Sequence, residues 1–250
     1  MKKAYCLVIA VFFLVLSIPL FPGTGIDIKD TRMLKEPAIS QNHIAFVYAG
    51  DLWVAGINGE NVRRLTTHEG EESNPVFSPD GRLIAFSAHY DGNTDVYVVS
   101  VEGGLPRRLT WHPNSDYVRG FTTDGSAVLF ISARNVYSYR YSQLFIVPLQ
   151  GGFPSQLKIP YANKAVYSPD GTRMAYTPLR DVFRQWKHYR GGSTSRIWIY
   201  RFDNHKVEQI PQPEGRCNDT EPMWIKDKSI SVQIETVNLT YFPLTCRVKK

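Results

Sequence analysis

The chain of 250 residues contains only three cysteines, Cys6, Cys217 and Cys246, and none of them belongs to a CxxC pair. A disulfide-rich scaffold, a zinc centre and a redox motif are therefore not expected. Glycine (18 residues) and proline (16 residues) occur at ordinary frequencies, which excludes a collagen-like or generally disordered chain. No window keeps the apolar spacing of an amphipathic helix, so helical repeats are disfavoured.

The net charge of +6 does not indicate a nucleic-acid partner. Several of the basic residues lie near the two ends of the chain, and no stripe rich in lysine or arginine remains between them. Nucleic-acid binding depends on such a stripe, because it must neutralise phosphates. We therefore expect no nucleic acid among the partners.

The first residues predict export. Lys2 and Lys3 precede an apolar run over residues 4–20, and the small residues Gly23 and Gly25 follow it. This order is typical of a secretory signal peptide, here residues 1–25, and in a bacterium it indicates the periplasm. A membrane anchor is the alternative, but two prolines interrupt the end of the run.

An internal repeat organises the rest of the chain. A Ser-Pro-Asp-Gly turn or its Thr-Thr-Asp-Gly variant recurs about every 45 residues, at residues 78–81, 122–125 and 168–171. Each turn is followed by an apolar segment and then by a segment rich in aromatic and branched residues, both of which favour strands. The unbroken apolar run over residues 83–86 predicts a strand covered on both faces.

Four short strands in about 45 residues are typical of a β-propeller blade, so we predict an all-β, four-stranded-blade propeller. Closed propellers have about four to eight blades, and the repeat fills only four to five here. The blades are expected at about residues 33–71, 72–116, 117–163 and 164–217, with the start of a fifth at residues 218–228.

The last residues depart from the repeat. After Lys228 the repeat predicts an apolar strand and a turn, and the sequence of residues 229–250 does not continue the pattern. A neighbouring reading frame that starts in the Lys228 codon can encode an apolar strand, an Asn-Gly turn and an aromatic strand. We therefore expect residues 229–250 to be a frameshifted tail, with a divergent blade as the alternative.

Several segments resemble the first propeller of the tricorn protease family, and the likeness covers about residues 36–228. The segments that carry it are residues 39–54, 70–73, 90–97, 186–192 and 221–224. The resemblance implies a six-bladed propeller at the start of a large hexameric serine peptidase, a hydrolase acting in proteolysis. It also implies that the catalytic domains lie outside this chain. The expected role is then non-catalytic: guiding peptide substrates or products, and assembling with the remaining domains and with other subunits.

Motifs for chemistry are scarce. The sequence has no GxSxG and no HExxH motif, and its six histidines are scattered singly. We therefore expect no catalytic residue, no metal ligand and no cofactor. Residues 91–95 are similar to the start of a calcium loop, but a strand follows where such a loop would continue, so a β-turn is the better interpretation.

The most distinctive segment is an insertion over residues 181–190, which mixes aromatic and cationic side chains. Arg184, Trp186, Tyr189 and Arg190 are candidates for contacts with a peptide or a neighbouring subunit. The alternative is a loop whose aromatic side chains pack on the edge of the blade.

For the whole chain, the alternatives are a free-standing periplasmic protein-binding propeller similar to TolB, and the propeller of a prolyl-oligopeptidase-like enzyme.

Overall fold

The computed structural model describes residues 33–138, 140–180, 192, 194–211, 218–225, 228–234 and 245–248. In these ranges the chain is all-β and forms four four-stranded sheets and one three-stranded sheet, each antiparallel. The prediction of an all-β propeller with four-stranded blades is confirmed, and the strands that the structure describes do not close into a ring. The described part of the chain contains no helix that is long and apolar enough to span a membrane.

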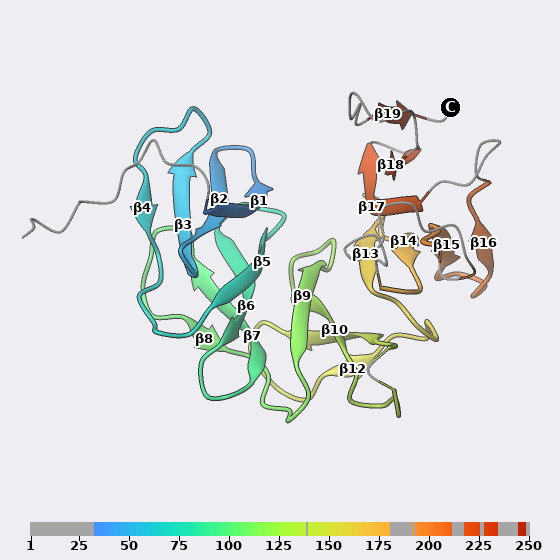
Figure 1. The fold of residues 1–250 in the computed structure, drawn as a ribbon, viewed down its shortest axis with the longest axis horizontal. Helices are drawn as coiled ribbons and strands as arrows, with labels where there is room; N and C mark the ends of the chain where they lie inside the picture. Colours follow the sequence, from blue (N-terminus) through green and yellow to red (C-terminus); the bar gives the residue numbers. More distant parts are fainter. Residues whose placement is uncertain are drawn as a thin grey trace, which may run out of the picture. The chain divides into compact units, whose positions relative to one another are not determined.

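The sheets follow one another along the chain and are called blades 1 to 5 (Figure 1). Blade 1 contains β1 (Leu34–Ile39), β2 (His43–Tyr48), β3 (Asp51–Gly56) and β4 (Arg63–Arg64). Blade 2 contains β5 (Glu72–Phe77), β6 (Leu83–His89), β7 (Thr94–Ser100) and β8 (Arg107–Arg108). Blade 3 contains β9 (Asp116–Phe121), β10 (Ala127–Ser132), β11 (Gln143–Pro148) and β12 (Ser155–Gln156). Blade 4 contains β13 (Lys164–Tyr167), β14 (Arg173–Thr177), β15 (Trp198–Arg201) and β16 (Val207–Gln209), and blade 5 contains β17 (Asn218–Ile225), β18 (Lys228–Ile234) and β19 (Thr245–Val248).

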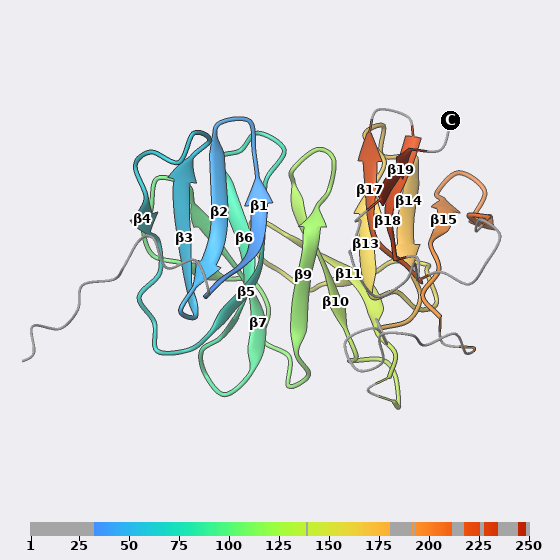
Figure 2. The ribbon, with the colours of Figure 1, turned by 45° about the horizontal axis from the view of Figure 1, so that its top comes forward.

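The first strand of each blade lies innermost. Extensive contacts join β1 to β5, β5 to β9, β9 to β13 and β13 to β17, whereas β4, β8, β12 and β16 contact extensively only the third strand of their own blade. Figure 2 shows β1, β9 and β17 upright in this order from left to right. Blades that meet through their first strands are the arrangement of a propeller. Among the described strands, no extensive contact leads from β17 back to β1.

The repeated turn is closed by its own side chains. The Ser78 hydroxyl donates to Asp80 Oδ1 at 2.6 Å and accepts from the Leu83 N–H at 2.9 Å, and the Arg82 N–H donates to Asp80 Oδ1 at 3.1 Å. Gly81 has a φ of 71°, a left-handed conformation that glycine adopts without strain. The turns at residues 122–125 and 168–171 repeat these bonds, so the sequence motif fixes the hairpin in three blades.

The core is divided into clusters that lie between neighbouring blades. Ile84 and Phe86 of β6 pack with Leu52 and Val54 of blade 1, whereas Ala85 packs toward blade 3 with residues such as Phe130. β6 is therefore buried on both faces, as its unbroken apolar run predicted. Because each cluster needs two blades, the blades stabilise one another through burial of apolar surface.

Candidate functional site

The first strands carry β-bulges that redirect individual side chains. The pairing shifts register between Lys35 and Ala38 in β1, and corresponding shifts occur in β5, β9 and β17. Glu36, Asn74 and Glu221 lie in these bulges with φ of 53°, 52° and 49°, and each stands directly before a proline. Non-glycine residues seldom adopt positive φ, and such positions concentrate at functional sites. The bulge in β9 contains Arg119 instead.

These residues connect the first strands of neighbouring blades. The Asn74 N–H donates to Glu36 Oε2 at 2.5 Å, and Arg119 Nε donates to the carbonyl oxygen of Asn163 at 2.5 Å. Lys164 Nζ lies 2.8 Å from Glu221 Oε1. We call Glu36, Asn74, Arg119, Lys164 and Glu221 the inner-strand cluster.

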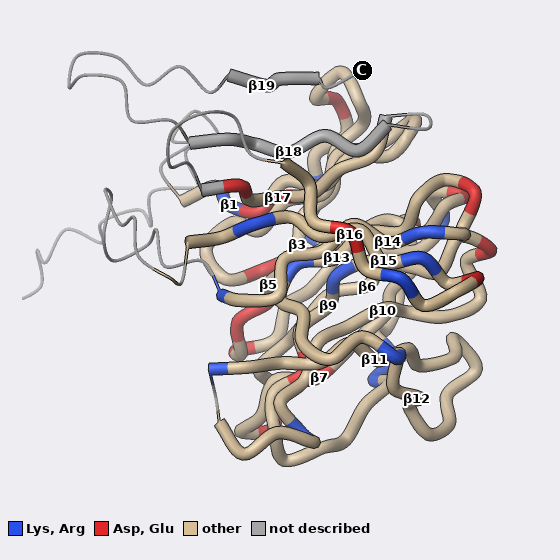
Figure 3. Tube along the Cα trace, turned by 90° about the vertical axis from the view of Figure 1, so that its right-hand side faces the viewer, with Lys and Arg blue, Asp and Glu red and all other residues tan. Residues whose placement is uncertain are grey.

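The cluster contains charges of both signs. Burial lowers the pKa of Arg119 to about 10, while the negative charges of Glu221 and Glu36 act in the opposite direction. Arg119 therefore remains a cation at neutral pH. Glu36 of blade 1 and Glu221 of blade 5 thus both act electrostatically on an arginine of blade 3. Figure 3 marks the acidic and basic positions along the strands.

A buried carboxylate also joins blades 1 and 2. Glu72 opens β5, is fully buried, and accepts hydrogen bonds from Thr66 Oγ1 at 2.9 Å and from the Tyr90 hydroxyl at 2.6 Å. Thr66 also accepts the Leu52 N–H at 2.9 Å, so one hydroxyl links β3 to the next blade. Burial raises the pKa of Glu72, and the two donated hydrogen bonds oppose that shift.

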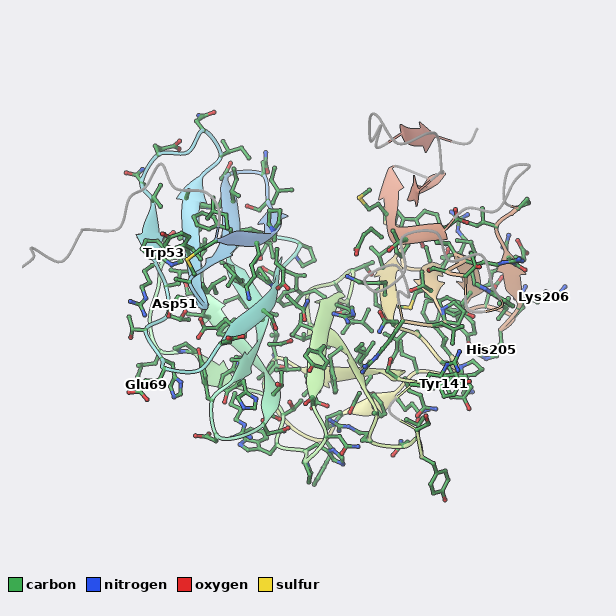
Figure 4. All side chains as sticks on the ribbon, viewed as in Figure 1. Asp51, Trp53, Glu69, Tyr141, His205 and Lys206 are labelled. Atoms are coloured by element: carbon green, nitrogen blue, oxygen red, sulfur yellow. The ribbon has the colours of Figure 1, made fainter. Side chains whose placement is uncertain are left out.

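Arginines of the outermost strands form ion pairs with acidic residues at or just before the start of the third strands. Arg64 pairs with Asp51 at 2.7 Å, and Asp51 is labelled in Figure 4. Arg108 pairs with Asp95 at 2.6 Å and with Asp91 at 3.1 Å. The two carboxylates of the calcium-like segment are thus bound by an arginine. Within the described ranges, no group of three or more metal-ligating side chains comes together.

Arg184, Trp186, Tyr189 and Arg190 lie outside the described residues, so their predicted contacts with a peptide or a subunit stay predictions. The sequence reasoning missed the inner-strand cluster. Its signal was present as an acid or amide directly before a proline at residues 36–37, 74–75 and 221–222.

Comparison with known proteins identifies the family. Residues 31–232 match the Tricorn protease N-terminal beta propeller domain. Tricorn protease homolog 1 of Streptomyces coelicolor is 32% identical over 186 residues, which are 74% of this chain and 17% of that protein. This chain therefore spans less than a fifth of the relative.

Two solved structures show the same fold. The crystal structure of the tricorn protease matches 80% of this chain and 20% of its own chain, with a TM-score of 0.68 and 23% identity. A protein described as TolB from Agrobacterium tumefaciens matches 80% of this chain and 69% of its own, with a TM-score of 0.63 and 22% identity. The resemblance predicted from the sequence is confirmed, and the chain belongs to the family of the Tricorn protease N-terminal beta propeller domain.

Proposed function

We propose that this chain is the non-catalytic propeller portion of an exported tricorn-like serine peptidase, and that its inner strands guide peptides to or from the catalytic domains. The observation that carries the proposal is the inner-strand cluster, in which Glu36, Arg119, Lys164 and Glu221 place two carboxylates and two cations on the first strands of four blades. A peptide presents N–H and carbonyl groups along its length and a charge of each sign at its ends. A mixed polar lining can contact all of these groups.

The contacts within this cluster are weak, which suits transient binding of a passing peptide better than tight binding. The side chains of Lys164 and Glu221 keep 32% and 53% of their surface exposed. An ion pair this accessible contributes about 0–1 kcal/mol, so a passing peptide can compete for either partner. The absence of a nucleophile motif from the sequence agrees with a guiding role.

A charge reversal in the full-length protein tests this proposal. Lys164→Glu places a second negative charge beside Glu221 and should lower kcat/KM for peptide hydrolysis by about fivefold, the equivalent of about 1 kcal/mol. Arg107→Glu is the matched control, because it makes the same change of charge on the exposed, outermost strand β8. Equal kcat/KM values for the two variants would refute guidance by the inner strands.

The second candidate function is a free-standing, TolB-like periplasmic propeller that binds proteins. The match to the TolB chain, which covers 69% of that chain, favours it. The gene sequence downstream of this chain separates the two functions. A PDZ domain and a tricorn catalytic core would support the first, and an immediate end without further domains would support the second.

Export, assembly and the frameshifted tail belong to the same proposal. A signal peptide over residues 1–25 predicts a mature protein in the periplasmic fraction that begins after Gly25, which N-terminal sequencing would detect. Assembly into a hexamer through contacts that include Arg184 and Trp186 predicts that replacing both residues lowers the mass of the full-length particle. Reading the gene beyond the Lys228 codon tests the frameshift, because an early stop in the shifted frame would contradict it.

A further inference from the structure

A pocket of about 390 Å³ lies where the first strands of blades 2 to 5 end. Its lining includes four aromatic side chains, Phe77, Phe121, Tyr167 and Trp224. The first three are the last residues of β5, β9 and β13, and each pairs with the strand that follows in the same register. The repeat therefore brings one aromatic residue from each of blades 2 to 5 to the same end of the inner strands.

A glycine in β9 gives the pocket its depth. Gly120 pairs with Leu129, while at the equivalent register position Val76 pairs with Ala85 in blade 2 and blade 4 has a valine. The φ of Gly120 is outside the left-handed region, and a Cβ atom added there would meet no heavy atom within 4 Å. The backbone does not require glycine at this position. Its effect is to leave the space in front of Leu129 open.

The residues that line the pocket suit a ligand with an apolar group next to an oxygen acceptor. Two proline rings, Pro79 and Pro169, extend the aromatic walls, and the single charged residue of the lining is Arg119. Its guanidinium donates to the carbonyl oxygens of Asn163 and Val118 at 2.5 and 2.9 Å. A group that already binds main-chain carbonyls at the edge of an aromatic pocket is suited to binding the carbonyl of a peptide.

The size of the pocket limits its occupant. Pockets for small ligands measure about 300–1,000 Å³, so this one is at the lower end of the range. It has room for one large side chain and the adjoining main chain. Aromatic side chains bury the most surface in such a site and gain further from contact with other rings.

We propose that this pocket is a subsite for one large apolar side chain of a peptide, with an aromatic side chain preferred, and that Arg119 binds a main-chain carbonyl oxygen of the same peptide. The inference rests on the proposed guiding function and names the class of peptide that the inner strands hold most strongly. It makes Gly120, Trp224 and Arg119 determinants of specificity.

Calorimetric titration of the full 250-residue chain tests the proposal. The probes are two capped tripeptides, acetyl-Gly-Phe-Gly-amide and acetyl-Gly-Gln-Gly-amide, which differ only in the central side chain. The phenylalanine peptide should bind at least about tenfold more tightly. Gly120→Leu should weaken its binding by about tenfold or more, whereas Gly120→Ala, which leaves most of the space open, should change it by less than about threefold. Equal affinities for the two peptides, or unchanged binding to a folded Gly120→Leu variant, would overturn the inference.

Thermal melting shows whether the Gly120→Leu variant is folded, and NMR provides a second test that does not need this variant. Leucine is compatible with a strand, so Gly120→Leu should melt at or above the temperature of the unaltered chain. If it does not fold, the unaltered chain still provides a test by NMR. The Trp224 indole N–H, which donates to the Val166 carbonyl at 3.2 Å, should shift when the phenylalanine peptide is added, and an unshifted indole signal at saturation would overturn the proposal.

The two proposals can fail separately. If the chain prefers the phenylalanine peptide and Gly120→Leu weakens that binding, but Lys164→Glu has no effect on peptide turnover, the guiding function is refuted and the subsite is supported. If Lys164→Glu lowers peptide turnover but the chain does not prefer the phenylalanine peptide, the subsite is refuted and the guiding function is supported.

Discussion

The stacking of the repeated turns can be tested at Gly171. A Cβ atom added at this glycine would lie 2.9 Å from Thr123 Oγ1, in the corresponding turn of the preceding blade. The same relation recurs one blade earlier, where a Cβ atom at Gly125 would lie 3.4 Å from Pro79 Cδ. The turns of successive blades therefore contact one another through their glycines. We expect Gly171→Ala to disrupt a contact between blades as well as the local backbone.

The expected loss in the free energy of unfolding of Gly171→Ala has two parts. Gly171 has a φ of 70°, and alanine in a left-handed conformation costs about 1–2 kcal/mol. The close approach to Thr123 adds the cost of overpacking, about 1–3 kcal/mol. Gly151→Ala is the control, because its φ is 93° and an added Cβ atom meets nothing within 4 Å. The control should lose only the first part of the free energy of unfolding.

Urea unfolding of both variants measures the difference. Gly171→Ala should be less stable than Gly151→Ala by about 1–3 kcal/mol. In a Thr123→Ala background the oxygen is absent, so most of that excess should disappear, and the double-mutant cycle should show coupling between the two positions. Equal losses of unfolding free energy for Gly171→Ala and Gly151→Ala would show that the turns do not touch, and would refute the contact of blades 3 and 4 through these turns.

Three further predictions follow from the described contacts. Hydroxyl and N–H donors hold the pKa of Asp124 and Asp170 at about 2, so the stability that they provide is present above pH 3.8 and is lost as the pH falls through about 2; carboxyl NMR titrations with midpoints near 3.8 would contradict this. Burial raises the pKa of Glu72 above 4.5, so its contribution is complete below pH 4.5 and is lost as the pH rises through the folded-state pKa. The free energy of unfolding should therefore change less with pH above pH 4.5 for Glu72→Gln than for the unaltered chain, and an identical pH dependence would count against a buried, hydrogen-bonded Glu72 between blades 1 and 2. Phe86→Ala removes a fully buried ring between blades 1 and 2 and should cost about 3–5 kcal/mol in urea unfolding; a loss below about 1 kcal/mol would mean that this cluster is not a packed core.

The sequence predicted the features that depend on neighbouring residues. Ser78, Asp80 and Gly81 define the turn by themselves, and the apolar run that continues through Ile84 and Phe86 indicates a strand buried on both faces. Their recurrence was enough to predict four-stranded blades.

The candidate site depends on residues that are distant in the sequence. Glu36 and Arg119 come from blades 1 and 3, and Phe77 and Trp224 approach one pocket from blades 2 and 5. No local pattern specifies such contacts. The residue before each proline was visible, but its positive φ and the partner of its side chain were not.

We propose that the inner strands form a path for peptides in a tricorn-like peptidase. The most direct test compares a long peptide and a short chromogenic peptide as substrates of the full-length protein, with and without Lys164→Glu. Guidance predicts that the variant lowers kcat/KM for the long peptide by about fivefold, while turnover of the short peptide, which contacts less of the inner strands, is nearly unchanged. Equal effects on both substrates, or no effect on either, would contradict the claim.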